Sequence, residues 1–185
     1  MSENLRNFTK ALYGFDAVVQ RVRPDQWDAD TPCEGWCARD LVAHECGVIG
    51  AVAQMAETGE IAMPTMPHVG DDPVGHWDAT RDRVLEALDT QGALHTHGNF
   101  WWGEMSIDQL VAFATWDPLA HSWDLAEATG QEAHADEGVA EAALATIAPM
   151  SETLRKMRLT AEPVDVPDDA DAMTRFLGLT GRNPR

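Results

Sequence analysis

The chain has 185 residues and a formal net charge of −18, because 31 aspartate and glutamate residues stand against 13 lysine and arginine residues. Binding to nucleic acid and to anionic lipid depends on lysine and arginine, so this charge excludes nucleic acid and membrane surfaces as partners. Apolar residues form 44% of the sequence, which is typical of a globular protein and sufficient for one domain over residues 1–185.

Helical periodicity dominates the first half of the chain. Apolar residues three and four positions apart predict a helix over residues 3–22, which Pro24 ends. A second helix is expected to begin near Cys37 and to carry His44 within an apolar stripe. A third helix is predicted over residues 72–88, after a loop that contains several prolines.

The second half of the chain is also mainly helical. Residues 92–105 are expected to form a long connection that is rich in aromatic side chains. A fourth helix is predicted over residues 106–129, with Gly130 as its C-terminal cap, and a fifth over residues 138–154. Residues 159–185 predict a short extended segment and then a short helix. Together these elements predict an all-α fold, a four-helix bundle with short extra helices.

The cysteines and the N-terminus indicate the compartment. The three cysteines, Cys33, Cys37 and Cys46, are an odd number and do not make a disulfide framework, so we expect reduced thiols. The N-terminus lacks the apolar region of a signal peptide. No segment approaches the roughly 20 apolar residues that span a bilayer. A cytoplasmic protein is therefore expected.

Two of the predicted helices carry ionisable side chains on faces that should be buried. Asp117 and His121 are four residues apart and leave the same face of the fourth helix. His44 occupies a position in the second helix where a hydrocarbon side chain would be expected. Burying an unpaired carboxylate is unfavourable, whereas a divalent metal ion binds carboxylate and imidazole together. We therefore predict that His44, Asp117 and His121 hold one divalent metal ion.

The same spacing has simpler interpretations. His44 can be a core residue bonded to a backbone carbonyl, and Asp117 and His121 can form a hydrogen-bonded pair. Pro118, between the two candidate ligands of the fourth helix, is expected to kink or bulge that helix. If the helix instead restarts at Pro118, Asp117 becomes an N-cap whose carboxylate binds backbone amides rather than a metal.

Further residues are predicted to surround the metal. Glu45, next to His44, is a candidate base or outer partner, or else a solvated side chain; no other catalytic residue is assigned. Asp124 and Trp123 are expected behind the ligands, with Asp124 accepting the second N–H of a metal-bound imidazole. Tryptophans are expected either to line the mouth of a pocket or to pack in the core or an interface. These tryptophans are Trp36, Trp101 and Trp102.

Three segments resemble DinB-like actinobacterial proteins, in the group that includes mycothiol-dependent maleylpyruvate isomerases. These segments are TPCEGWCARDLVAHE, WDPLAHSWDLAEATG and VDVPDDADAMTRFLGLTGRNP. The resemblance implies a DinB-like four-helix bundle of a short, single-domain branch. It also implies that His44, Asp117 and His121 match the metal-ligand positions of the family. The co-substrate that it implies is mycothiol or a similar low-molecular-weight thiol.

Together with the predicted metal site, this resemblance implies a metal-dependent enzyme of thiol chemistry, a transferase or an isomerase acting on a small electrophilic substrate. Zinc suits the ligands, and nickel or iron(II) also fits two histidines and one carboxylate. Two alternatives stay open, a metal-dependent hydrolase and a non-catalytic metal-binding protein or homodimerising module. A fourth protein ligand from Glu45, Cys46 or Asp124 would favour a structural site over a catalytic one.

Overall fold

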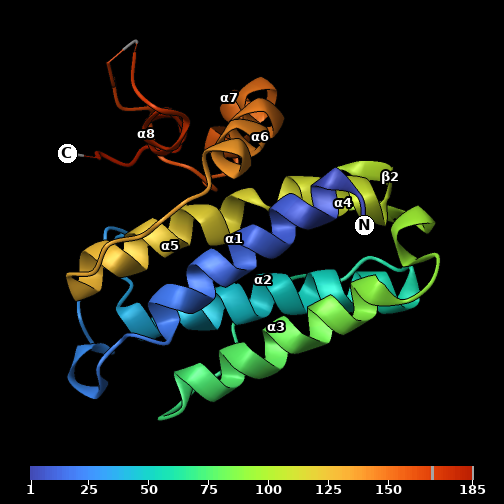
Figure 1. Ribbon diagram of the computed structural model, residues 1–185, viewed down its shortest axis with the longest axis horizontal. Coiled ribbons are helices and arrows are strands. Elements are labelled where there is room, and N and C mark those ends of the chain that lie inside the picture. Colours follow the sequence, from blue (N-terminus) through green and yellow to red (C-terminus); the bar gives the residue numbers. More distant parts are fainter. Residues whose placement is uncertain (168, 185) are drawn as a thin grey trace.

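Helices make up most of the computed structural model, which describes residues 1–167 and 169–184 (Figure 1). The helices are α1 (Glu3–Val19), α2 (Ala38–Thr58), α3 (Pro73–Asp89), α4 (Ile107–Ala114), α5 (Trp116–Thr129), α6 (Glu137–Ile147), α7 (Ser151–Lys156) and α8 (Ala172–Leu179). Single 3₁₀ turns cover Pro24–Gln26, Ala93–His95 and Ala148–Met150. The strands β1 (His97–Phe100) and β2 (Gly103–Ser106) form a small hairpin. The predicted all-α fold is confirmed.

Two positions of the predicted C-terminal tail, 168 and 185, lie outside the described residues. The tail otherwise follows the prediction, with an extended segment that leads into α8. Within the described part of the chain, no helix has the length and apolar character needed to cross a membrane.

Helix α5 lies at the centre of the molecule. Figure 1 shows α4 and α5 end to end, with α1, α2 and α3 on one side and α6, α7 and α8 on the other. One apolar core lies among α1 to α5 and includes Leu125 of α5. A second core lies between α4–α5 and α6–α8 and includes Leu119 of α5. Because α5 is covered on both sides, most of its polar residues are buried, including Asp117, His121 and Asp124.

The predicted fourth helix is divided into two helices. Helix α4 ends at Ala114 and α5 begins at Trp116. Pro118 accounts for the break, because it has no N–H to donate to the carbonyl of Ala114 and its ring would clash with that carbonyl. The chain resumes its helix before Pro118, with Thr115 as the N-cap, so Asp117 lies in the first turn of α5. The alternative in which Asp117 is the N-cap is therefore wrong.

The expected loop over residues 92–105 contains the β1–β2 hairpin. The strands are antiparallel, with Phe100 opposite Gly103. Gly103 has a φ of 109°, which favours glycine. The segment connects α3 and α4 as expected, but the two strands were not predicted, because the turn residues are Trp101 and Trp102, which lack the Asn-Gly or Asp-Gly signal of a tight hairpin.

Helix α1 ends at Val19, three residues earlier than predicted. Glycine and proline determine two other helix ends. The predicted helix over residues 138–154 is divided at Pro149 into α6, a 3₁₀ turn and α7, because proline cannot continue the hydrogen-bond pattern. Gly130, with a φ of 65°, caps α5 as predicted.

Both ends of α2, which carries His44, are stabilised by nearby residues. At the N-cap, the backbone N–H of Cys37 donates to Asp40 Oδ2 (3.0 Å) and its thiol donates to the same oxygen (3.1 Å). Gly59, with a φ of 71°, ends the helix. Burial and the hydrogen bond with Asp40 raise the pKa of the Cys37 thiol, so the helix N-terminus does not activate it as a nucleophile.

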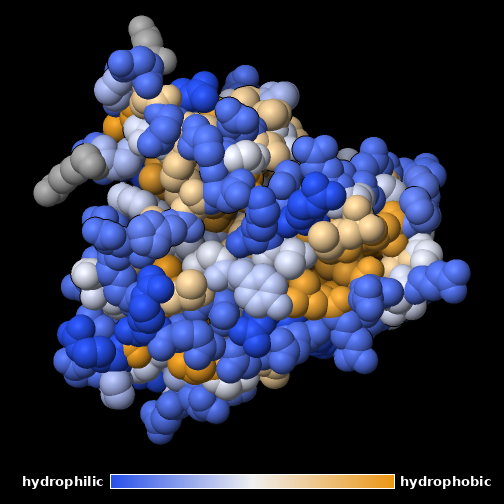
Figure 2. Space-filling view, viewed as in Figure 1, coloured by the Kyte–Doolittle hydropathy of each residue, from blue (hydrophilic) through white to orange (hydrophobic). Residues whose placement is uncertain are grey.

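Hydrophilic residues cover most of the face drawn in Figure 2, as the high net charge requires. An apolar patch on this face lies between the N-terminal half of α1 and the C-terminal half of α2 (Figures 1 and 2). Apolar patches on soluble proteins commonly mark interaction sites. The homodimer stays a prediction.

Candidate metal centre

The three predicted ligands converge between α2 and α5. His44 Nε2 lies 3.0 Å from Asp117 Oδ2. His121 Nε2 lies 3.7 Å from Asp117 Oδ1, on the other oxygen of the same carboxylate. The ring centroids of His44 and His121 are 5.0 Å apart. Asp117 therefore lies between two imidazoles that come from different helices.

The cluster is shielded from solvent except beside His44, the most exposed of the three predicted ligands. The side chains of Asp117 and His121 are 8% and 7% exposed, whereas that of His44 is 24% exposed. The ring of Trp36 lies 4.9 Å from that of His44 and 6.1 Å from that of His121. Trp36 thus covers the imidazoles, in the region where the sequence predicts the mouth of a pocket.

The other tryptophans have contacts typical of packing. Trp101 Nε1 donates to the carbonyl of Ala62 (2.7 Å). The ring of Trp102 lies 5.1 Å from that of Phe113 on α4. Trp123 is partly buried against the core between α5 and α6–α8. These contacts support the packing alternative for Trp101 and Trp102, and the place of Trp123 behind the metal ligands stays a prediction.

His44 and Asp117 form a partly buried hydrogen-bonded pair. Burial lowers the pKa of the His44 imidazole, but the hydrogen bond and charge of Asp117 outweigh burial and raise it. Burial likewise raises the pKa of Asp117, and the hydrogen bond from His44 with the charges of His44 and His121 brings it below its usual value. The hydrogen-bonded pair considered from the sequence, Asp117 with His121, is therefore replaced by a pair between helices.

Asp124 holds the second nitrogen of His121. Its Oδ2 atom lies 2.8 Å from His121 Nδ1, and the carboxylate is fully buried. Although burial raises the pKa of Asp124, the hydrogen bond from His121 and the charge of Arg182 hold it well below its usual range. An ionised carboxylate only accepts hydrogen bonds, so Nδ1 of His121 carries a proton, and Nε2 faces Asp117. Asp124 thus contacts the ring nitrogen of His121 that the sequence assigned to it, and its role behind a metal-bound imidazole stays a prediction.

Glu45 completes a group of four candidate ligands. One ligand atom from each of His44, Glu45, Asp117 and His121 lies within 4.8 Å of the others. Glu45 is fully buried, so the solvated alternative is wrong. Neither of its oxygens has a hydrogen-bond partner among the described residues. Burial and the charge of Asp117 raise its pKa well above the usual value.

The chemistry of this group fits a divalent cation. A buried carboxylate without a hydrogen bond is stable only when it is protonated or lies beside a positive charge. Two imidazole nitrogens and two carboxylates are ligands that zinc, iron(II) and nickel accept. The unpaired oxygens of Glu45 are the observation that a bound cation would explain.

Sequence reasoning missed two residues next to this cluster. Arg182, from the C-terminal segment, donates to both oxygens of Asp124. Cys33 Sγ lies 3.4 Å from Asp124 Oδ2 and 4.0 Å from His121 Nδ1. Burial, together with the Asp124 carboxylate, raises the pKa of Cys33 to about 12, so it is a protonated thiol. No local pattern distinguishes Arg182 from Arg175 and Arg185 of the same tail.

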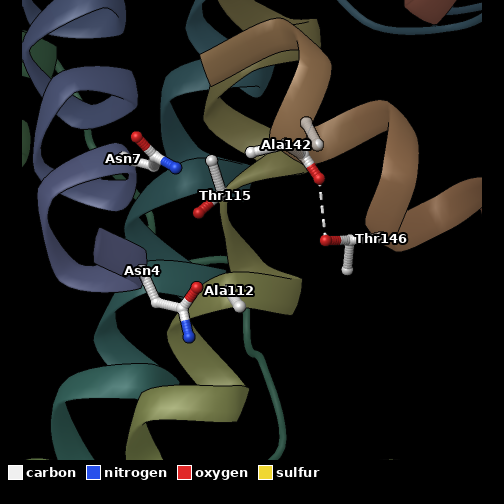
Figure 3. Close-up of a pocket in the computed structure, with 7 residues that line it drawn as sticks. Asn4, Asn7, Ala112, Thr115, Ala142 and Thr146 are labelled. Carbon is white, nitrogen blue, oxygen red and sulfur yellow. Dashed lines mark hydrogen bonds between the residues drawn. The ribbon is translucent and has the colours of Figure 1, made fainter. Parts of the chain in front are cut away.

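A small cavity lies elsewhere, between α1, α4 and α6 (Figure 3). Its walls include Asn4, Asn7 and Thr115, together with Thr146, whose hydroxyl donates to the carbonyl of Ala142 (2.8 Å). Its volume of about 20 Å³ accommodates roughly one water molecule. This cavity is too small for a substrate.

The fold and the site define the class of protein, an all-α bundle with a buried His–Asp–His cluster between two helices. Within this class the chain belongs to the family described as "Mycothiol maleylpyruvate isomerase N-terminal domain", whose model matches residues 8–126. That range contains His44, Asp117, His121 and Asp124. The resemblance noted in the sequence is thereby confirmed at the level of the family.

Similar proteins extend the comparison to nearly the whole chain. Two curated proteins of Mycobacterium tuberculosis, "Uncharacterized protein MT0763" (strain CDC 1551 / Oshkosh) and "Uncharacterized protein Rv0738" (strain ATCC 25618 / H37Rv), are each 30% identical over 178 residues, 94% of this chain and 96% of theirs. The crystal structures of the mycothiol-dependent maleylpyruvate isomerase and of a mutant share the fold, each with a TM-score of 0.57 and 15% identity. Each match covers 98% of this chain and 89% of the isomerase chain.

Proposed function

We propose that this chain is a cytoplasmic, metal-dependent enzyme of thiol chemistry, a transferase or isomerase. Its co-substrate would be mycothiol or a similar low-molecular-weight thiol, and its second substrate a small electrophile. The observation that carries the proposal is the convergence of two imidazoles and a buried carboxylate from α2 and α5 on one point. Family membership supports the choice of thiol, since the solved relative is named as mycothiol-dependent.

His44 Nε2, the carboxylate of Asp117 and His121 Nε2 are the groups that would hold the metal. A divalent metal bound there supplies the positive charge that converts a thiol into a nucleophilic thiolate at neutral pH. Zinc is the first choice, with nickel and iron(II) as alternatives. Asp124 keeps the proton of His121 on Nδ1, which leaves Nε2 available as a ligand.

The protein also controls access to the site. Trp36 lies over both imidazoles and limits the entry of water beside His44. Excluding water strengthens electrostatic interactions within the site. Glu45 lies within reach of the other ligand atoms. Beside a bound cation its carboxylate would be ionised, and it is then the candidate to take up the proton that the incoming thiol releases.

A second candidate function follows from the position of Glu45. If its carboxylate binds the metal as a fourth protein ligand, the coordination is that of a closed structural site. The chain would then be a non-catalytic metal-binding protein. A metal-dependent hydrolase needs the same open position as the thiol enzyme, with water in place of the thiol.

Cobalt(II) substitution separates these functions. We expect the metal-free protein to bind one cobalt ion and to develop a thiolate-to-cobalt absorption band when mycothiol is added. The His44→Ala variant should bind cobalt weakly, whereas His134→Ala, at an exposed position, should behave as the wild type. A cobalt spectrum that mycothiol leaves unchanged would favour the structural site. Wild-type protein that binds no metal would overturn the proposal.

A further inference from the structure

Arg182 reaches the metal cluster from the opposite end of the sequence. Its side chain is only 11% exposed. Its Nη2 donates to Asp124 Oδ2 (2.7 Å) and its Nε donates to Asp124 Oδ1 (3.2 Å). Its Nη1 donates to the carbonyl of Thr180 (3.2 Å). All three nitrogens of the guanidinium therefore bind the protein itself, and Arg182 does not present a free fork for an anionic substrate.

The backbone turn after α8 determines where Arg182 lies. The N–H of Arg182 donates to the carbonyl of Leu177 (2.8 Å), which turns the chain back after α8. Gly181 has a φ of 86°, and a Cβ there would lie 2.6 Å from the Cβ of Ala161. The extended segment before α8 is joined to it by the bond from the N–H of Val164 to the carbonyl of Gly178 (2.9 Å). The arginine is thus placed by a packed turn.

Arg182, Asp124 and His121 form a continuous chain of hydrogen bonds. Oδ2 of Asp124 accepts from Arg182 Nη2 and from His121 Nδ1 at 2.7 and 2.8 Å. The two-point contact with the guanidinium fixes the plane of the carboxylate, since a fork of two N–H groups binds both oxygens. The fixed carboxylate in turn determines where the Nδ1–H of His121 points. The Nε2 of the same ring then faces Asp117.

Stability alone does not account for this arrangement. Removing both charges of a buried ion pair in favour of apolar groups is often neutral or stabilising, because desolvation offsets the attraction. Metal ligands, by contrast, depend on the groups that orient them, and removing such a group typically weakens metal binding 10- to 100-fold.

We propose that Arg182 is a positioning residue of the metal centre, which holds Asp124 so that His121 presents Nε2 to the metal. This inference rests on the metal site of the proposed function. It makes the C-terminal segment part of the site, although the segment lies about 60 positions beyond the ligands of α5 and outside the range of the family model.

The test compares Arg182→Met, which removes the charge but keeps much of the side-chain volume, with Arg182→Lys and with Arg175→Met. Arg175 is an exposed residue of α8 and serves as the matched control. Zinc affinity is measured by competition with a chelator. We expect Arg182→Met to bind zinc 10- to 100-fold more weakly, Arg182→Lys to be intermediate, and Arg175→Met to equal the wild type.

A second measurement does not depend on metal. In the metal-free wild type, ¹⁵N NMR of the imidazole of His121 should report a proton on Nδ1. In Arg182→Met the same signals should shift towards a mixture of Nδ1–H and Nε2–H forms. A merely structural role would lower the melting temperature without moving these signals.

The outcomes separate the two proposals. Wild-type protein that binds no zinc would overturn the metal site, whatever the NMR signals report. If the wild type binds zinc and Arg182→Met matches it in affinity and in the nitrogen signals of His121, the positioning role is overturned. Should Arg182→Met fail to fold, Arg182→Lys decides, because lysine keeps the charge but loses the fork. Unchanged affinity and signals in that variant would equally overturn the role.

Discussion

The imidazole of His44 on α2 and the carboxylate of Asp117 on α5 meet at 3.0 Å, although 73 positions separate the two residues. This polar contact joins the two helices at the edge of an apolar core to which both contribute. It also means that the metal-free protein satisfies Asp117 by its own residues. The first prediction follows from this pair.

Replacing His44 by alanine leaves Asp117 buried without its nearest partner. We expect His44→Ala to lower the free energy of unfolding of the metal-free protein by about 1–3 kcal/mol, the usual penalty for an unpaired buried polar group. Urea denaturation in the presence of a chelator measures it. The control His134→Ala removes an exposed histidine and should change the stability by less than about 0.5 kcal/mol. Equal stability of His44→Ala and the wild type would contradict a stabilising contact between His44 and Asp117.

Glu45 should make the metal-free protein less stable as the pH rises. Burial raises its pKa, so the folded protein keeps a proton that the unfolded chain loses above about pH 4.3. Folded stability therefore declines from that pH upward until the folded carboxyl also ionises. Glu45→Gln is neutral throughout and removes this decline, so it should be more stable than the wild type at about pH 8 and similar at about pH 4.

Urea denaturation at the two pH values, with a chelator present, checks this prediction. With zinc bound, the wild type should instead be the more stable of the two proteins, because glutamine lacks the negative charge that a metal stabilises. Zinc should therefore raise the melting temperature of Glu45→Gln less than that of the wild type. A wild type whose advantage over Glu45→Gln grows with pH in the absence of metal would rule out a protonated, buried Glu45.

The thiol of Cys33 should be unreactive although it lies beside the site. With a pKa of about 12 it is almost entirely protonated at neutral pH, and burial also raises the pKa of Cys46 to about 11. Alkylation by iodoacetamide at about pH 8 should therefore be at least about 1,000-fold slower at Cys33 in the native, metal-free protein than in the unfolded chain. Peptide mass spectrometry over time gives both rates. Comparable rates would show that Cys33 is ionised or freely exposed.

Gly181 should tolerate alanine much less well than Gly92. Both have a φ close to 87°, but a Cβ on Gly181 would meet Ala161 at 2.6 Å, whereas nothing lies within 4 Å of one on Gly92. We expect Gly92→Ala to lower the free energy of unfolding by about 1 kcal/mol, from backbone strain alone. Gly181→Ala should lower it by about 2–4 kcal/mol, because the clash adds to the strain. Matching losses in urea denaturation would mean that the C-terminal turn is not tightly packed.

Much of the candidate site follows from local rules. The apolar stripe of α2 places His44 on its inner face, and a separation of four residues places Asp117 and His121 on one face of a helix. Pro118 predicts an interruption of that helix, and Gly130 predicts its end. These features depend only on helical periodicity and on the conformational preferences of single residues, so the sequence by itself determined them.

The tertiary structure decided the rest. Glu45 lies next to His44 in the chain, yet whether it meets solvent or the ligands depends on how α2 packs against α5. Asp124 is fully buried beside Cys33 of the loop before α2, and a turn after α8 brings Arg182 to it. Contacts between segments far apart in sequence depend on the angles and distances at which helices pack. Those angles and distances arise from the fit of side chains across two apolar cores. A local sequence pattern does not predict that fit.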